Sequence, residues 1–301
     1  MNKSRFSTRH ALAAAAVIFI WGMNFYVIKI GLKGFPPILL GAVRFTMVAF
    51  PAVLFLPRPK VPFKWLAAYG LSISFAQFAF LFSAIAAGMP AGLASLVLQA
   101  QAFFTVAISA VVFGDKLRFS NLFGMLIAAV GLYLLGRASL IDASHPVPLI
   151  GFVLTLCSAL SWATGNVVSK KIGPTAALSL VAWGALVTVI PYFLLSFYVE
   201  GLEQIQASLA HIALPSILTI AYLSFIASLV GYTLWGKLLV ALPTHMVAPL
   251  TLLVPVIGLS SCWLLLDEAL HASQILGAGV VMLGLVVNVF GQNLMRRLRA
   301  I

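Results

Sequence analysis

The sequence predicts an all-α membrane protein in which ten transmembrane helices form two inverted five-helix repeats around a central cavity. Three observations carry this prediction: the composition, the spacing of the apolar segments, and a similarity between the two halves of the chain. Of the 301 residues, 62% are hydrophobic and only 8% are charged, against roughly 45–50% and 25% in average soluble proteins. A water-soluble fold cannot bury this much apolar surface. The composition therefore excludes a soluble enzyme, a nucleic-acid-binding protein and a disordered chain.

Charged residues, prolines and glycines divide the chain into ten apolar segments, each long enough to cross a bilayer as a helix of roughly 20 residues. Prolines fall at the start of several segments, where the missing N–H costs no helical hydrogen bond. The predicted spans are 11–32, 36–56, 65–87, 90–113, 119–137, 149–170, 175–198, 213–236, 243–266 and 271–294. Only the loops at 138–148 and 199–212 are longer than a few residues, so no domain outside the membrane is expected.

The distribution of Lys and Arg predicts the orientation of these spans. With the N-terminus placed inside, 14 of the basic residues lie in inner segments and 3 lie at outer ends. Inner loops of membrane proteins carry an excess of Lys and Arg. Both termini are therefore predicted to be cytoplasmic, and we interpret the net charge of +12 as a topology signal rather than a surface for a polyanion.

The second half of the chain is similar in sequence to the first. Spans 1 and 6 match at an offset of 141 residues, and spans 3–5 match spans 8–10 without a gap at an offset of 153. The matching pairs include Trp21 and Trp162, Tyr69 and Tyr222, Pro90 and Pro243, Asp115 and Glu268, Gly124 and Gly277, and Gly131 and Gly284. Because five is an odd number of spans, the second repeat must cross the membrane in the opposite direction. We therefore divide the chain into repeats at 1–140 and 141–301, an architecture typical of transporters.

Several short motifs resemble those of a known family. They are WGMNF at Trp21–Phe25 with Lys29 behind it, SWATGN at Ser161–Asn166, GYTLW at Gly231–Trp235, the pair Asp267–Glu268, and Arg44 in the second span. In order and spacing they resemble the EamA family of the drug/metabolite transporter superfamily, over nearly the whole chain. Asp115 stands where the family has a glutamate, so no role is carried over to it.

The resemblance implies a function and a place for the substrate. It implies a ten-helix exporter of amino acids and related metabolites in the bacterial inner membrane, most like the family's exporters of aromatic amino acids. It also implies that helices 1, 3, 4, 6, 8 and 9 surround the central cavity. A carrier of another small metabolite, such as a nucleoside or a sugar phosphate, and a proton-coupled drug exporter stay open as alternatives.

Ionisable residues are scarce at membrane depth. All six acidic residues lie at helix ends or in loops, whereas ion-coupled carriers commonly place a carboxylate near the bilayer centre. Transport is therefore expected to run down the substrate gradient, with His245 as the remaining titratable candidate. Arg44 lies eight residues into its span, about 12 Å deep. It is expected either to bond backbone carbonyls or to attract a substrate carboxylate.

Aromatic and uncharged polar residues at membrane depth form the predicted substrate site. Its residues are Trp21, Asn24, Gln77, Phe78, Phe82, Ser95, Gln99, Trp162, Asn166, Ser228, Tyr232, Trp235 and His245. Gln99 is expected to face the cavity. Gln101, turned by about 200° on a regular helix, is expected to bond a neighbouring helix. In span 3, the aromatic face through Phe78 and Phe82 and the polar face through Gln77 are alternatives.

No pattern in the sequence indicates catalysis. We find no nucleophile–base pair and no metal-binding cluster, and Cys157 and Cys262 lie in apolar runs without metal-site or disulfide spacing. No catalytic residue, metal or cofactor is predicted; the expected partners are an amino acid substrate and the lipid bilayer, without nucleic acid. Gly277, Gly284 and Gly291 recur every seven residues, and small residues let helices approach closely. Spans 5 and 10 are therefore expected to pack together in a monomer, with a dimer as the alternative.

Overall fold

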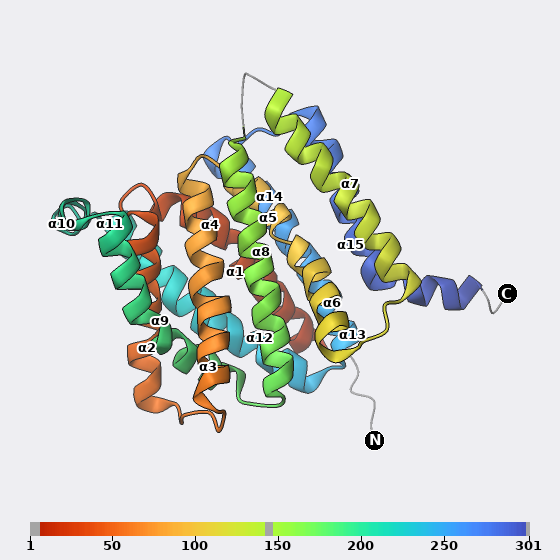
Figure 1. The fold of residues 1–301 in the computed structure, drawn as a ribbon, viewed down its shortest axis with the longest axis horizontal. Helices are drawn as coiled ribbons and strands as arrows, with labels where there is room; N and C mark the ends of the chain where they lie inside the picture. Colours follow the sequence, from red (N-terminus) through yellow and green to blue (C-terminus); the bar gives the residue numbers. More distant parts are fainter. Residues whose placement is uncertain (1–6, 142–146, 299–301) are drawn as a thin grey trace.

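A computed structural model of the protein describes residues 7–141 and 147–298 (Figure 1). Within these residues, ten helical segments are long and apolar enough to cross a membrane, which confirms the ten predicted spans. Their elements are α1 (Thr8–Gly31), α2 (Pro37–Phe55), α3 (Phe63–Tyr69), η1 (Gly70–Ala76), α4 (Gln77–Ala86), α5 (Ala91–Val97), α6 (Ala100–Phe113), α7 (Phe119–Ile141), α8 (Leu149–Ile172), α9 (Ala177–Val199), α11 (Leu214–Ala221), η2 (Tyr222–Val230), α12 (Gly231–Ala241), α13 (Thr244–Val247), η3 (Ala248–Leu253), α14 (Val254–Leu266) and α15 (Ala272–Leu298).

Four of the spans are irregular helices. Spans 3 and 8 contain the π-helical segments η1 and η2, in which the backbone hydrogen bonds reach one residue further than in an α-helix. Span 4 is interrupted between α5 and α6, and span 9 begins with the short α13 and the 3₁₀ segment η3. The offset of 153 residues that relates spans 3 and 8 also relates η1 to η2. This is consistent with the inverted repeat, which stays a prediction.

The loop expected at 199–212 contains a further short helix, α10 (Leu202–Ala210). Gly201 separates it from α9 by adopting a positive φ of 78°, a conformation in which a side chain would be strained. Figure 1 shows α10 at the edge of the bundle, beside the start of α11. None of its residues is buried, so α10 is a short exposed helix at the edge of the bundle rather than a separate domain.

Helices α7 and α15 run side by side along one flank of the bundle (Figure 1). Their glycines permit backbone contact: a Cβ atom added to Gly284 would lie 2.7 Å from both the backbone nitrogen of Ala128 and the carbonyl oxygen of Gly124. Near one end of the pair, Asn121 Nδ2 donates to Asn288 Oδ1 at 2.7 Å. The expected packing of spans 5 and 10 is thus confirmed, and small residues are its cause.

Two glutamates at helix ends hold distant parts of the chain together. The carboxylate of Glu200, just after α9, accepts hydrogen bonds from the backbone N–H groups of Ile38 and Leu39 at 2.6 and 3.0 Å. Glu268, just after α14, accepts from the first two backbone N–H groups of α5 at 3.0 and 2.9 Å. Each carboxylate satisfies amide groups that have no partner within their own helix. These two acidic residues therefore have a structural use at the bundle end, away from mid-membrane.

Candidate functional site

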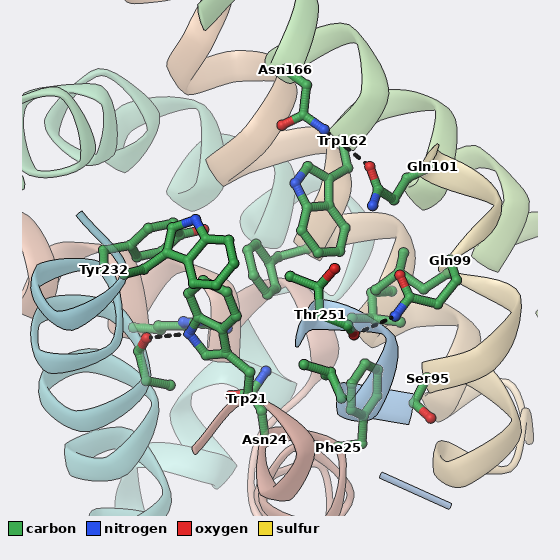
Figure 2. Close-up of a pocket in the computed structure, with 17 residues that line it drawn as sticks. Trp21, Asn24, Phe25, Ser95, Gln99, Gln101, Trp162, Asn166, Tyr232 and Thr251 are labelled. Carbon is green, nitrogen blue, oxygen red and sulfur yellow. Dashed lines mark hydrogen bonds between the residues drawn. The ribbon is translucent and has the colours of Figure 1, made fainter. Parts of the chain in front are cut away.

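A cavity of about 260 Å³ lies between the two halves of the chain. Side chains from α1, α2, α4, α5, α6, α8, η2, α12, η3 and α14 line it (Figure 2). The lining residues are Trp21, Asn24, Phe25, Arg44, Phe78, Leu81, Ser95, Leu98, Gln99, Gln101, Trp162, Asn166, Ala227, Tyr232, Trp235, Thr251 and Val254. Nine of the thirteen residues expected at the substrate site from the sequence are among them, and they come from both halves of the chain.

Three aromatic rings form one wall of the cavity. The ring of Trp21 packs against those of Tyr232 and Trp235, with centroids 5.5 and 5.4 Å apart. Its indole N–H donates to the carbonyl oxygen of Ala227, in η2, at 3.1 Å. A Cβ atom at Gly231 would lie 2.6 Å from the indole nitrogen, so only glycine admits the ring at this position. The π-helical segment and its following glycine therefore hold Trp21 in place.

Amide side chains form the opposite part of the lining (Figure 2). Asn166 Nδ2 donates to Gln101 Oε1 at 3.0 Å and to Thr105 Oγ1 at 3.3 Å. Gln99 Nε2 donates to the carbonyl oxygen of Thr251 at 3.3 Å. Trp162 lies beside these amides, one helical turn before Asn166. The cavity therefore joins an aromatic wall to a polar one.

The expected roles of Gln99 and Gln101 need one correction. Gln101 does bond a neighbouring helix, but it lines the cavity together with Gln99. The backbone between α5 and α6 is tighter than an α-helix: the N–H groups of Gln99, Gln101 and Ala102 bond to carbonyls three residues earlier. In such a turn, two residues rotate by about 240° rather than 200°. The 200° rotation of a regular α-helix therefore does not apply at this break, and the expectation that Gln101 turns away from the cavity was wrong.

Three predicted site residues lie outside the cavity lining. Phe82 is 0% exposed and packs edge-on against Phe78, with centroids 5.6 Å apart. Gln77 is also buried, and its backbone carbonyl accepts from Ser158 in α8 at 2.7 Å. The cavity face of span 3 instead runs through Phe78 and Leu81, which are one turn apart. Neither alternative face lines the cavity as expected: Phe78 of the aromatic face does, Phe82 does not, and Gln77 is turned about 100° away from Phe78.

Ser228 is the third of these residues, and it bonds a residue that lines the cavity without lining it itself. Its hydroxyl donates to the carbonyl oxygen of Leu223, five residues earlier, at 2.8 Å. The longer reach of the π-helix makes this contact possible. The same hydroxyl accepts from Arg44. The side chain of His245 lies outside the described residues, so its expected role stays a prediction.

The arginine at membrane depth borders the cavity and is almost fully buried. Arg44 is 3% exposed, and its NH2 donates to Ser228 Oγ at 3.3 Å. Its guanidinium carbon lies 4.1 Å from the centre of the Phe78 ring and 5.1 Å from that of Phe45. Among the described residues, no backbone carbonyl accepts from the guanidinium, so the carbonyl bonds expected as one alternative are not seen there. No ion pair of Arg44 is found in the part of the chain that the structure describes.

The remaining lining residues were not among the expected ones. They are Phe25, Leu81, Leu98, Ala227, Thr251 and Val254. Most are apolar and lie next to, or one turn from, residues with a polar or aromatic signal, so nothing in the sequence separates them from packed core. Among the described residues, no group of His, Cys, Asp and Glu is arranged to hold a metal ion.

Comparisons with known proteins agree on the class of this protein. The model of the EamA-like transporter family matches residues 8–137 and 149–290. The chain is 51% identical over 289 residues to the probable amino-acid metabolite efflux pump of Escherichia coli K12, covering 95% of this chain and 96% of that protein. It is 50% identical over 297 residues to the protein of the same name from Salmonella typhimurium LT2, covering 97% and 99%.

A solved crystal structure has the same fold. It aligns with a TM-score of 0.63 over 93% of this chain and 95% of its own, at 19% sequence identity. The family and the relatives at about 50% identity bear the names of transporters rather than enzymes. The match to both halves and the identity over nearly the full length show that the chain belongs to the EamA-like transporter family.

Proposed function

We propose that this protein exports neutral, preferentially aromatic, amino acids and related metabolites across the bacterial inner membrane by alternating access. The observation that carries the proposal is the cavity, which combines flat aromatic walls with amide groups between the two halves of the chain. Its volume of about 260 Å³ lies below the roughly 300–1,000 Å³ of pockets for drug-sized ligands. This favours a small metabolite over the drug that the alternative exporter would carry.

The two walls match the two parts of an amino acid. The rings of Trp21, Tyr232 and Trp235 offer apolar faces to a side chain, and aromatic faces also attract an ammonium group. The amides of Gln99 and Gln101 offer donors and acceptors to the polar end. A phosphate ligand favours two or more cations, whereas Arg44 is the one Lys or Arg among the described lining residues. This favours an amino acid over a sugar phosphate.

Counterflow in proteoliposomes tests the substrate and the driving force together. Vesicles loaded with neutral, aromatic, acidic or basic amino acids, a nucleoside or a sugar phosphate are offered a labelled trace of the same compound. We expect exchange of neutral and aromatic amino acids without a pH or sodium gradient, because no carboxylate is among the described lining residues. Accumulation above equilibrium under an imposed pH gradient, abolished in His245→Ala, would contradict uncoupled transport. Exchange of phosphates but not of amino acids would contradict the substrate class.

The orientation that the basic residues predict can be tested by labelling from outside the cell. In a background lacking Cys157 and Cys262, single cysteines are placed at Arg58 and Glu203, which are both exposed. A membrane-impermeant maleimide added to intact cells is expected to label Glu203→Cys, and to label Arg58→Cys only after permeabilisation. The reverse pattern would place both termini outside and would contradict the orientation that the basic residues predict.

A further inference from the structure

Arg44 carries a charge at membrane depth that no described side chain neutralises. Its side chain is 3% exposed, and the described residues form no ion pair with it. A buried charge without a counter-ion is strongly unfavourable, and within a membrane span it generally marks a functional position. Because Arg44 borders the cavity, an anionic group that enters the cavity would supply the missing counter-charge.

The protein itself satisfies only part of the guanidinium. NH2 donates to Ser228 Oγ, while Nε and NH1 are buried and have no hydrogen-bond partner among the residues that the structure describes. The ring of Phe78, 4.1 Å from the guanidinium carbon, attracts the cation but accepts no conventional hydrogen bond. Unsatisfied buried donors are rare in folded proteins and need a specific reason. Here the two unpaired nitrogens indicate a site for an anion.

A third unpaired atom, on another residue that borders the cavity, has the opposite character. Asn24 Oδ1 is buried and has no hydrogen-bond partner in the described part of the chain, and the residue is 8% exposed. An amide oxygen accepts hydrogen bonds, as an ammonium group requires. Two residues that border the cavity thus carry buried, unpaired polar atoms, one cationic and one an acceptor, and these complement the carboxylate and the ammonium of a zwitterion.

We propose that Arg44 binds the substrate's α-carboxylate, so that a free carboxylate is required for recognition, and that Asn24 Oδ1 accepts from the substrate's ammonium. This inference rests on the proposed function and assigns residues to the polar end of that same site. An arginine–carboxylate pair is charge-assisted and about twice as strong as a neutral hydrogen bond. The aromatic wall then contributes affinity for the side chain, while Arg44 selects amino acids against amines and amides.

The first test changes the ligand and leaves the protein as it is. Binding of L-phenylalanine and of L-phenylalaninamide to the purified wild-type protein is followed by quenching of tryptophan fluorescence, since Trp21, Trp162 and Trp235 line the cavity. The amide keeps the ring and the ammonium but lacks the negative charge. We expect it to bind at least about tenfold more weakly, as the loss of a hydrogen bond to a charged group implies. Equal binding would overturn the role of Arg44 and leave the proposed function standing, whereas absence of both binding and counterflow for every amino acid would overturn the proposed function.

The second test changes the protein and asks whether the discrimination disappears. Arg44→Gln is expected to weaken binding of L-phenylalanine at least about tenfold while leaving binding of L-phenylalaninamide unchanged. Arg44→Lys should keep part of the preference because it keeps the charge. Arg58→Gln removes an exposed arginine outside the cavity and should change neither. An equal loss for both ligands in Arg44→Gln would show a structural role and overturn the inference; if this variant does not fold, the wild-type comparison still decides.

Discussion

Replacing Tyr232 or Trp162 with alanine is expected to weaken substrate binding by on the order of 1–3 kcal/mol, roughly 5- to 150-fold, while folded protein still reaches the membrane. Both side chains line the cavity, so each substitution removes a flat surface on which a substrate side chain would stack. Tyr232 also supports the ring of Trp21, whose centroid is 5.5 Å away. The weaker substrate binding expected for Tyr232→Ala therefore also reflects the greater mobility of the Trp21 ring once its neighbour is removed.

The measurement is the half-saturating substrate concentration in counterflow, at matched expression, together with the dissociation constant from fluorescence quenching. Phe290→Ala is the matched control, because this ring is 44% exposed near one end of α15 and is not a cavity residue. Its transport should stay at the wild-type level. Wild-type transport in both Tyr232→Ala and Trp162→Ala would place the substrate site elsewhere in the bundle.

Substitution of Gly284 by leucine is expected to separate α7 from α15 and to lower the melting temperature of the protein. Even a single Cβ atom there would lie 2.7 Å from backbone atoms of Gly124 and Ala128, and backbone cannot move aside as a flexible side chain can. Overpacking of this kind costs about 1–3 kcal/mol and sometimes more. Because α7 and α15 contribute no residue to the described cavity lining, transport per folded molecule should change little.

Gly279 provides the matched control on the same helix. It is exposed, and a Cβ atom added there would meet nothing within 4 Å. Thermal unfolding of the purified protein in detergent should therefore show a large shift for Gly284→Leu and almost none for Gly279→Leu. Equal shifts for the two variants would contradict the close approach of α7 and α15.

Hydropathy and charge in the sequence determined the secondary structure and the number of spans. A bilayer offers no hydrogen bonds to backbone groups, so each crossing segment must be helical and must have a minimum apolar length. For this reason all ten spans could be predicted, as could the glycine contacts between α7 and α15. The positions of Trp21, Asn24 and Trp162 at the cavity were predictable because buried polar groups are unfavourable in lipid and must face a partner or a cavity.

Only the tertiary structure decided which face of each helix lines the cavity. In a membrane span, the lipid-facing side and the packed side are both apolar, so the hydrophobic pattern carries little information about orientation. The faces are set by irregular backbone: the π-helical η1 precedes Phe78, and the tight turn between α5 and α6 brings Gln99 and Gln101 to the same cavity. The same limit applies to Arg44. The sequence placed its charge at membrane depth. Only the packing of Phe78 and Ser228 around it shows that two of its nitrogens have no partner among the described residues, because whether a donor is satisfied depends on neighbours that are distant in the chain.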